Sequence, residues 1–247
     1  MSNVPAFWSG LPDAKAGAHY THSERPLKAI RKIVVKGSVD VYFRRFNTPQ
    51  LVVAGETQDA VDAIKTYFKG DKLIIENEGT SFQCGGVHFS TGKGAIHIGS
   101  FGEGVHININ GQNIHISGNA NRGGHGRAVV GVALPEIPEV NIKGSGNITL
   151  LDLKQAGIEL EIEGSGDITA SGQVDSLEVS IAGSGDVDAS DLIANRGHLS
   201  IAGSGDIRAY VSQAVTARVA GSGDIVVRGN PPQRSKQIAG SGSVKFK

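Results

Sequence analysis

Four aspartates recur at a regular spacing in the C-terminal half of the chain. They follow Gly-Ser-Gly in the sequence, with Asn147 and Ser243 in the same place at the two ends, and are Asp167, Asp186, Asp206 and Asp224. If these motifs stack on neighbouring strands, the carboxylates lie about 4.8 Å apart and repel one another unless something neutralises or hydrogen-bonds them. Because Ca²⁺ prefers oxygen ligands, one hypothesis is a calcium-binding column. The alternative is that each aspartate accepts backbone N–H groups of its own glycine turn.

Four histidines form a second regular series. Each is flanked by apolar residues, as in VHF and IHI, and they stand nine residues apart at His88, His97, His106 and His115. If the flanking residues face a core, the imidazoles face outward, where they could bind Zn²⁺ or Cu²⁺ or change charge near their titration range. An exposed polar row without a ligand is the alternative. An antiparallel meander would place all four histidines on one face, whereas a two-sided coil of eighteen residues would divide them two and two.

The aspartates belong to a repeat that dominates the second half of the chain. Gly-Ser-Gly followed by Asn, Asp or Ser and then by Ile or Val occurs six times, at steps of 18 to 20 residues, from Gly144, Gly164, Gly183, Gly203, Gly221 and Gly240. A fixed period of this kind is typical of a solenoid, and short β-branched repeats around a glycine turn favour strands. We therefore predict an all-β fold, a parallel β-helix with coils of about nineteen residues.

Two apolar columns support this prediction. The first stands two residues before each repeat and comprises Ile142, Ile162, Ile181, Ile201, Val219 and Ile238. The second follows the Asp position and comprises Ile148, Ile168, Val187, Ile207, Ile225 and Val244. Since side chains alternate along a strand, both columns should point into one shared core. The glycines on either side of the serine are expected to take positive φ, so Gly183→Val or Gly203→Val should be costly.

Composition restricts the classes of function. The chain has 35 glycines and 5% aromatic residues, which suits a turn-rich β architecture. Its 24 basic and 24 acidic residues balance, so we expect no nucleic-acid partner. Cys84 is the only cysteine, which excludes a disulfide framework and a cysteine metal site. No apolar run has the length of a signal peptide or a membrane span, so the sequence predicts a cytoplasmic protein by default.

The chain divides into four predicted parts. Residues 1–27 read as an N-terminal arm or strap, 28–78 as an irregular N-terminal β region, 79–127 as a Gly/His-rich β insertion and 128–247 as the parallel β-helix with its six repeats. In the second part, GSVDV from Gly37 to Val41 looks like a degenerate first copy of the repeat. Farther on, Val61, Ile64 and Phe68 have helical spacing before Gly70, which predicts a short helix or a single turn of one.

The combination of these segments resembles a known family. GSVDV, VDAIKTYFKGDKLIIEN, LPEIPEVNIKGSGNI and the GSGD coils together are similar to the GIN domain, a family assigned to the heads of autotransporter adhesins, over about residues 28–78 and 128–247. The resemblance implies a single-stranded right-handed β-helix and an adhesive or structural role at the cell envelope or surface. It implies no catalytic residues. The His-bearing segment at 79–127 and the missing export signal are departures from the family pattern.

The sequence thus favours a non-catalytic, adhesin-like scaffold. Its faces or its open C-terminal coil would contact a protein partner or a like subunit, giving a homo-oligomer. A metal- or glycan-binding module using the Asp or His column, with Ca or Zn as the ion, is the first alternative. A polysaccharide-active enzyme is the second, with Arg208, Arg218 and Arg228 near the Asp column. The six repeated serines are turn residues, because a nucleophile would be singular and would need a base beside it.

Overall fold

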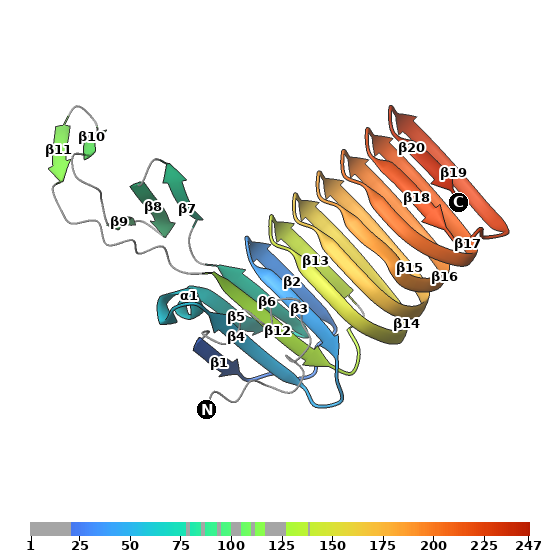
Figure 1. Cartoon of the computed structure of the whole chain (residues 1–247), viewed down its shortest axis with the longest axis horizontal. Helices are drawn as coiled ribbons and strands as arrows, with labels where there is room; N and C mark the ends of the chain where they lie inside the picture. Colours follow the sequence, from blue (N-terminus) through green and yellow to red (C-terminus); the bar gives the residue numbers. More distant parts are fainter. Residues whose placement is uncertain are drawn as a thin grey trace.

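The chain folds as a parallel β-solenoid, as its repeat predicts. The computed structural model describes residues 21–77, 80–84, 87–92, 95–99, 105–109, 112–116, 127–137 and 139–247, with side chains for 21–77, 127–137 and 139–247. Figure 1 shows the coils stacked in a row, with the strands of successive coils lying side by side. One hydrogen-bonded sheet of fifteen strands runs through the whole stack.

Each coil has two faces that meet at the Gly-Ser-Gly corner. We call face A the strands that lead into the corner, namely β2 (Lys32–Gly37), β13 (Glu139–Gly144), the C-terminal parts of β14 (Ile148–Gly164), β15 (Ile168–Gly183), β16 (Val187–Gly203) and β17 (Ile207–Gly221), and β19 (Gln233–Gly240). Face B comprises the strands that leave the corner, namely β3 (Asp40–Arg45), the N-terminal parts of β14 to β17, β18 (Asp224–Arg228) and β20 (Ser243–Phe246). The long strands β14 to β17 therefore run from face B round to face A.

The two predicted apolar columns form the core. Strand registers pair each member with the next, as in Ile162 with Ile181 and Ile168 with Val187. All the members are at most 6% exposed except Ile238 on β19, which is 40% exposed. Most of the core is one continuous cluster from Ile33 to Val244. Val52, Ala54, Val129 and Ala133 form a small second cluster. The expected degenerate first copy is confirmed, since Gly37 pairs with Gly144.

The two glycines of each corner differ in φ, although a Cβ at either would clash with the preceding coil, as at Gly183, where it would lie 2.0 Å from the carbonyl oxygen of Gly164. The first has positive φ, as at Gly183 with φ 148°, as the sequence predicts. The second does not, and the expectation of two positive φ angles is wrong there. A Cβ at Gly185 would lie 2.0 Å from the carbonyl oxygen of Gly166 in the preceding coil. The second glycine is therefore required by the close stacking of backbones from coil to coil.

The N-terminal strands stack in an order that differs from their order in the chain. β6 (Lys72–Asn77) pairs in parallel with β2 on face A, and β12 (Ala128–Leu134) pairs in parallel with β3 on face B. These two strands form the coil before β2 and β3 in the stack, although they follow them in the sequence. The segment 78–127 thus joins β6 to β12 at the corner where the later coils carry Gly-Ser-Gly.

Antiparallel strands and a short helix close this end of the solenoid. β5 (Ile64–Lys69) pairs with β6, while β4 (Gln50–Gly55) lies between β12 and β1 (Thr21–Arg25). The helix α1 (Gln58–Asp62) connects β4 to β5 and is capped by the Thr57 side chain, which accepts the N–H of Ala60.

The predicted helix is correct in place but wrong in extent. Only Val61 of its three apolar positions lies in α1, whereas Ile64 and Phe68 lie on β5. The β-branched and aromatic residues of IKTYFK favour a strand, and pairing with β6 buries Ile64 against the end of the core.

Charged side chains partly cover the C-terminal end. Val215 and Ala217 of β17 face the core, and in the next strand, β19, they pair with Arg234 and Lys236. These two charged residues therefore stand at core-facing positions. The Arg234 guanidinium donates from Nε to the carbonyl oxygen of Pro231 at 2.7 Å and from Nη2 to Asn230 Oδ1 at 2.9 Å. It also lies 5.5 Å from the ring centroid of Phe246. The last coil is thus less open than the sequence predicts, because an arginine lies across its end.

Among the described residues between β6 and β12, five strands form two small sheets. β7 (Thr80–Cys84), β8 (Val87–Gly92) and β9 (Ala95–Gly99) form one antiparallel sheet, and β10 (Val105–Ile109) and β11 (Gln112–Ile116) form the other. Within the described part of the chain, no helix has the length and apolar character needed to cross a membrane.

Candidate functional site

The predicted aspartate column exists, and its members are hydrogen-bonded from coil to coil. Oδ1 of Asp167 accepts the backbone N–H of Asp186 at 2.9 Å, and Oδ1 of Asp186 accepts that of Asp206 at 2.8 Å. The series continues through Asp224 to the N–H of Ser243. The aspartates are therefore backbone acceptors, but each donor belongs to the next coil and not to the aspartate's own turn.

This geometry bears on the calcium hypothesis for the column. In each aspartate one carboxylate oxygen is already bonded to a backbone N–H, and successive coils are about 4.8 Å apart. Asp206 has a cation near its other oxygen, since Arg208 Nη2 lies 3.9 Å from Oδ2. The column therefore presents one carboxylate oxygen per coil that is not bonded to a backbone N–H, arranged in a line. It does not surround a single position with several ligands.

The three arginines of the enzyme hypothesis do not gather at one place. Arg208 and Arg228 lie on face B, after the corner, whereas Arg218 lies on face A between Ser200 and Gln237. The repeated serines are held alike through their backbones: the N–H of Ser184, for example, donates to the carbonyl oxygen of Gly164 at 2.9 Å.

The histidine series falls on strands whose side chains lie outside the described residues. His88 and His97 are on β8 and β9 of the three-stranded sheet, and His106 on β10 pairs with His115 on β11 in the other sheet. The four histidines are thus divided between two antiparallel sheets, which differs from both the single meander and the eighteen-residue coil. Whether their imidazoles bind a metal stays a prediction.

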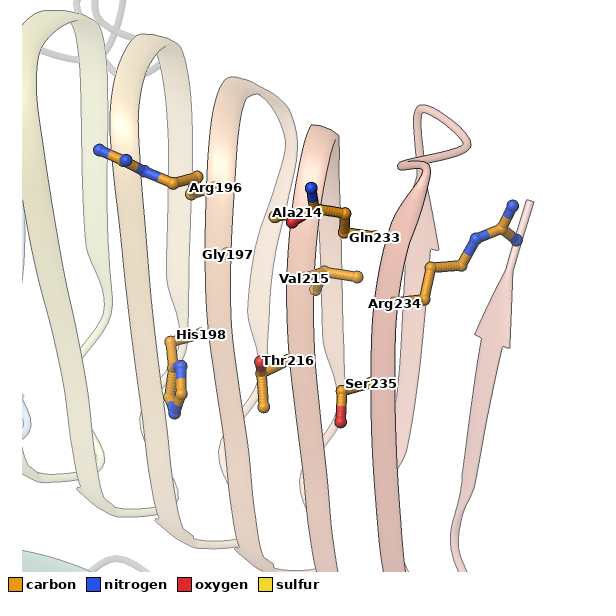
Figure 2. A pocket seen from close by; sticks show the side chains of 9 residues that line it. All are labelled: Arg196, Gly197, His198, Ala214, Val215, Thr216, Gln233, Arg234 and Ser235. Atoms are coloured by element: carbon orange, nitrogen blue, oxygen red, sulfur yellow. The ribbon is translucent and has the colours of Figure 1, made fainter.

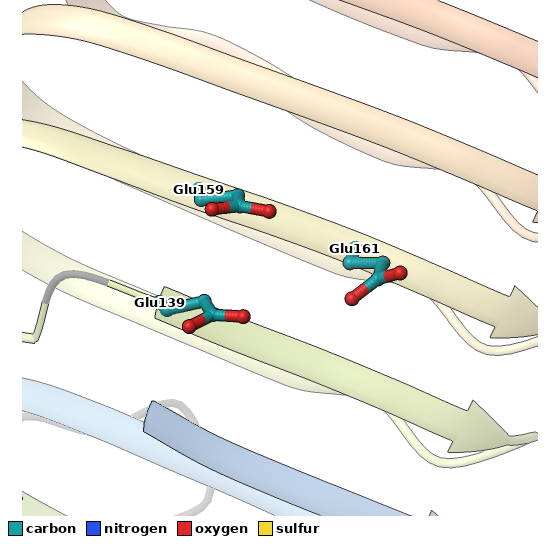
Figure 3. Close-up of side chains that lie close together, drawn as sticks. All are labelled: Glu139, Glu159 and Glu161. Carbon is teal, nitrogen blue, oxygen red and sulfur yellow. The ribbon is translucent and has the colours of Figure 1, made fainter. Parts of the chain in front are cut away.

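Face A also carries an acidic cluster that was not predicted from the sequence. Carboxylate oxygens of Glu139, Glu159 and Glu161 lie within 4.8 Å of one another on β13 and β14 (Figure 3). The periodic spacing of glutamates could have revealed it, since Glu139, Glu159 and Glu178 stand one coil apart and pair in register.

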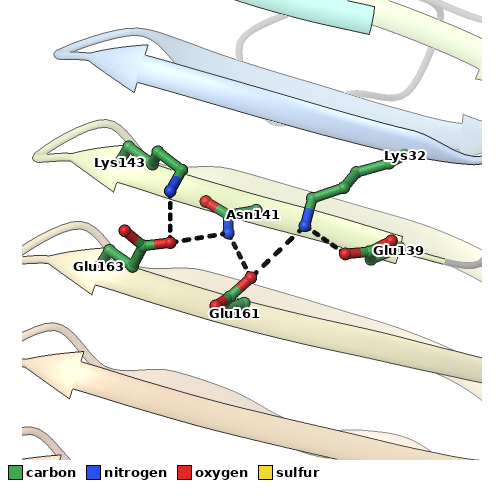
Figure 4. Close-up of polar contacts among 6 residues, drawn as sticks. All are labelled: Lys32, Glu139, Asn141, Lys143, Glu161 and Glu163. Carbon is green, nitrogen blue, oxygen red and sulfur yellow. Dashed lines mark hydrogen bonds and ion pairs between the residues drawn. The ribbon is translucent and has the colours of Figure 1, made fainter. Parts of the chain in front are cut away.

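Lys32 provides positive charge to this cluster. Its Nζ contacts Glu139 and lies 3.4 Å from Glu161 Oε2 (Figure 4). Burial alone would lower the pKa of Lys32, but the two carboxylates outweigh it and raise that pKa above its usual value. Asn141, which is 1% exposed, donates from Nδ2 to both Glu161 and Glu163.

The pKa values of Glu159 and Glu163 are shifted in opposite directions. Desolvation raises the pKa of Glu159, and the neighbouring charges of Glu139 and Glu178 raise it further. Hydrogen bonds from Lys143 and Asn141 instead lower the pKa of Glu163. Of the three clustered carboxyls, Glu159 is therefore the one whose charge is least compensated.

A shallow groove lies farther along face A and carries the opposite charge. It has a volume of about 400 Å³ and is lined by residues of β16, β17 and β19, including Arg196, His198, Thr216 and Arg234. Figure 2 shows Arg196 and His198 on one strand of the groove, with Thr216 on the next. Face A thus changes from acidic near β13 and β14 to basic near β16 to β19.

The comparisons with known proteins concern the chain as a whole. A family model described as "Putative auto-transporter adhesin, head GIN domain" matches residues 30–231. A search of curated proteins found no match.

A search of solved structures found several matches, three of which have TM-scores of 0.44 to 0.60. One described as a putative adhesin from Bacteroides fragilis has a TM-score of 0.60 and 17% identity, covering 92% of this chain and 97% of the other. A putative adhesin from Parabacteroides merdae has a TM-score of 0.48 and 13% identity, with 93% and 97% covered. Another from Parabacteroides distasonis has a TM-score of 0.44 and 17% identity, with 94% and 98% covered.

Proposed function

Because the chain belongs to the head GIN domain family, we propose that it is a non-catalytic, adhesin-like scaffold that binds protein surfaces through the outward side chains of face A. The family match, which covers more than three quarters of the chain, supports the adhesin-like class. The observation that carries the choice of face A is its charge pattern. An acidic cluster around Glu161 and a basic region around Arg218 are presented side by side on one rigid sheet.

The solenoid suits such a role for a physical reason. Each outward side chain is fixed by the strand register, so charges keep a constant spacing along the stack and little conformational entropy is lost when a partner binds. Charged groups arranged on a rigid surface give specificity and fast association more than high affinity. The proposal therefore predicts moderate, salt-sensitive binding to surfaces with a complementary charge pattern.

The test measures binding and catalysis in parallel. The chain is passed over immobilised fibronectin, collagen and mucin at low and high salt, and incubated with a polysaccharide panel that is then assayed for new reducing ends. We expect saturable, salt-sensitive binding to at least one protein and no reducing ends. Binding unaffected by Arg218→Glu would remove face A from the proposal. If the chain produced new reducing ends and the Asp206→Asn variant did not, the protein would be an enzyme that cleaves polysaccharides.

A further inference from the structure

We propose that face A also binds face A of a second copy of this chain, with the two solenoids running in opposite directions. The inference rests on the proposed scaffold role and names one partner for its surface. It follows from the positions of the outward side chains, which the strand registers fix.

From β13 to β19, face A carries three outward rows that have one residue in each of six coils, and a further row that contains Arg196. Row 1 comprises Glu139, Glu159, Glu178, His198, Thr216 and Ser235. Row 2 comprises Asn141, Glu161, Ser180, Ser200, Arg218 and Gln237. Row 3 comprises Lys143, Glu163, Ala182, Ala202, Ala220 and Ala239. Within these six coils, the acidic residues of rows 1 and 2 occupy the first three coils, and Arg218 and His198 occupy the last three. Lys32 stands in row 1 one coil earlier, on β2, and so lies beyond the six coils.

A two-fold axis parallel to the strands makes this pattern self-complementary. Placed between β15 and β16, the axis reverses the order of the coils and keeps each row opposite itself. Glu161 then faces Arg218 of the second copy, and Glu178 faces His198. A two-fold axis along the solenoid would instead set Glu161 against Glu161 and Arg218 against Arg218. Like charges opposed across an interface repel each other, so the antiparallel arrangement is favoured over this one.

Small side chains lie where the two faces would come closest. Ser180 and Ser200 meet across the axis in row 2, and Ala182 and Ala202 do so in row 3, so the longer side chains beside the axis in these three rows are the paired Glu178 and His198 of row 1. Six strands at their usual spacing give a face of about 24 Å by 20 Å, or about 1,000 Å² buried in total. This area is at the lower limit for a specific complex, so we expect a weak dimer whose stability depends on its charges.

The end of the solenoid is less suited to bind a second copy. Arg234 and Lys236 occupy core-facing positions of the last coil, and inward charges on an edge strand discourage stacking of another chain. Ile238 is the large apolar side chain of the first column that this end leaves exposed, at 40%. Self-association through face A therefore leaves the charged end in solvent.

The test uses charge reversal on one face with a matched change on the other. Sedimentation velocity of the full chain is measured from about 1 µM to about 500 µM, where so small an interface is expected to form, at low and high salt. We expect a dimer that weakens with salt. Arg218→Glu should raise its dissociation constant at least tenfold, because the introduced carboxylate would then oppose Glu161 twice per dimer. Arg228→Glu, the same change on face B of the same coil, should leave it unchanged.

A second pair of variants tests the pairing itself. His198→Glu should dissociate the dimer, and adding Glu178→Arg should restore it, because the two positions face each other across the axis. Circular dichroism and thermal melts verify that each variant is folded. A chain that stays monomeric throughout, or a dimer that Arg218→Glu leaves intact, would overturn the inference. A monomer that still binds the immobilised proteins would leave the scaffold role standing, so the two failures are distinguishable.

Discussion

Oδ1 of Asp167 accepts the backbone N–H of Asp186 at 2.9 Å, which joins two residues in successive coils. The same bond recurs down to Ser243, so a ladder of side-chain acceptors runs along the corner beside the backbone ladders. A hydrogen bond to a charged acceptor contributes about 1.5–3 kcal/mol, and this offsets the repulsion between neighbouring carboxylates. The repeated aspartate is thus explained as a structural link between coils.

Replacing one of these aspartates should destabilise the solenoid. Asp206→Ala removes the acceptor for the N–H of Asp224, and we expect unfolding in urea to require about 1–2 kcal/mol less free energy. Asp206→Asn keeps an oxygen at this place and should cost less. Asp191→Ala, on an exposed site outside the column, is the control and should change the free energy by less than about 0.5 kcal/mol. Equal losses at both sites would contradict the ladder.

The second corner glycine should tolerate no side chain. Gly185→Ala puts a Cβ 2.0 Å from the carbonyl oxygen of Gly166, and neither backbone can move without breaking the stack. We expect a loss of about 3 kcal/mol or more, visible in thermal denaturation. Gly157→Ala is the matched control, because its Cβ would meet ordinary contacts at 3.5 Å or more. Similar melting temperatures for the two variants would refute this account of the corner.

The free energy of unfolding should depend on pH through Glu159 and Glu163, whose contributions have opposite signs. The folded-state pKa of Glu159 is raised, so its ionisation costs stability as pH rises from its usual value near 4.5 through the folded pKa. Glu159→Gln should therefore stabilise the chain at about pH 7. The folded-state pKa of Glu163 is lowered, so its contribution is present above the usual value and is lost as pH falls through the folded pKa. Glu163→Gln should destabilise at the same pH.

Urea unfolding at about pH 7 and at about pH 3 separates these effects. At the lower pH Glu159 is protonated in both states, so Glu159→Gln should no longer differ from the parent chain. Glu163→Gln should lose part of its effect over the same interval. A stabilisation by Glu159→Gln that persists in acid would show that the change acts through packing and not through charge.

Calcium should leave the solenoid unchanged. Ca²⁺ takes about six to eight oxygen ligands, whereas each coil of the aspartate column offers one oxygen not bonded to a backbone N–H. We predict the same melting temperature in millimolar calcium and in EDTA. An increase in calcium that disappears in Asp186→Asn would instead establish a metal site in the column. The parallel test for the histidines replaces His97 and His106 by Asn and compares zinc uptake.

The charge at the C-terminal end should prevent longer assemblies. Lys236→Leu replaces a core-facing charge in the last coil by an apolar residue that matches the buried column of Ala217. We expect species larger than a dimer in light scattering, because the exposed end of the core can then be covered by another chain. Lys245→Leu makes the same change at an outward position of face B and should produce none. Large species in both variants would point to general insolubility.

The sequence alone determined the stacking of the coils. Its period of 18 to 20 residues returns an Ile or Val to the same place each time, and only a coil of that length buries every copy. Columns such as Ile162 and Ile181 could therefore be predicted residue by residue. The glycine corner could be predicted too, because the need for small residues appears in each copy.

Tertiary structure decided the rest, because it depends on contacts between distant segments. Ile64 and Phe68 have a helical spacing yet form a strand, since the edge of β6 offers backbone partners that a local pattern does not show. β6 and β12 stack before β2 and β3 despite following them in the chain. The donor to each aspartate comes from the next coil, and Glu161 and Arg218 share one row only through the register of four strands. Periodicity fixes which residues recur, whereas strand register fixes which of them meet.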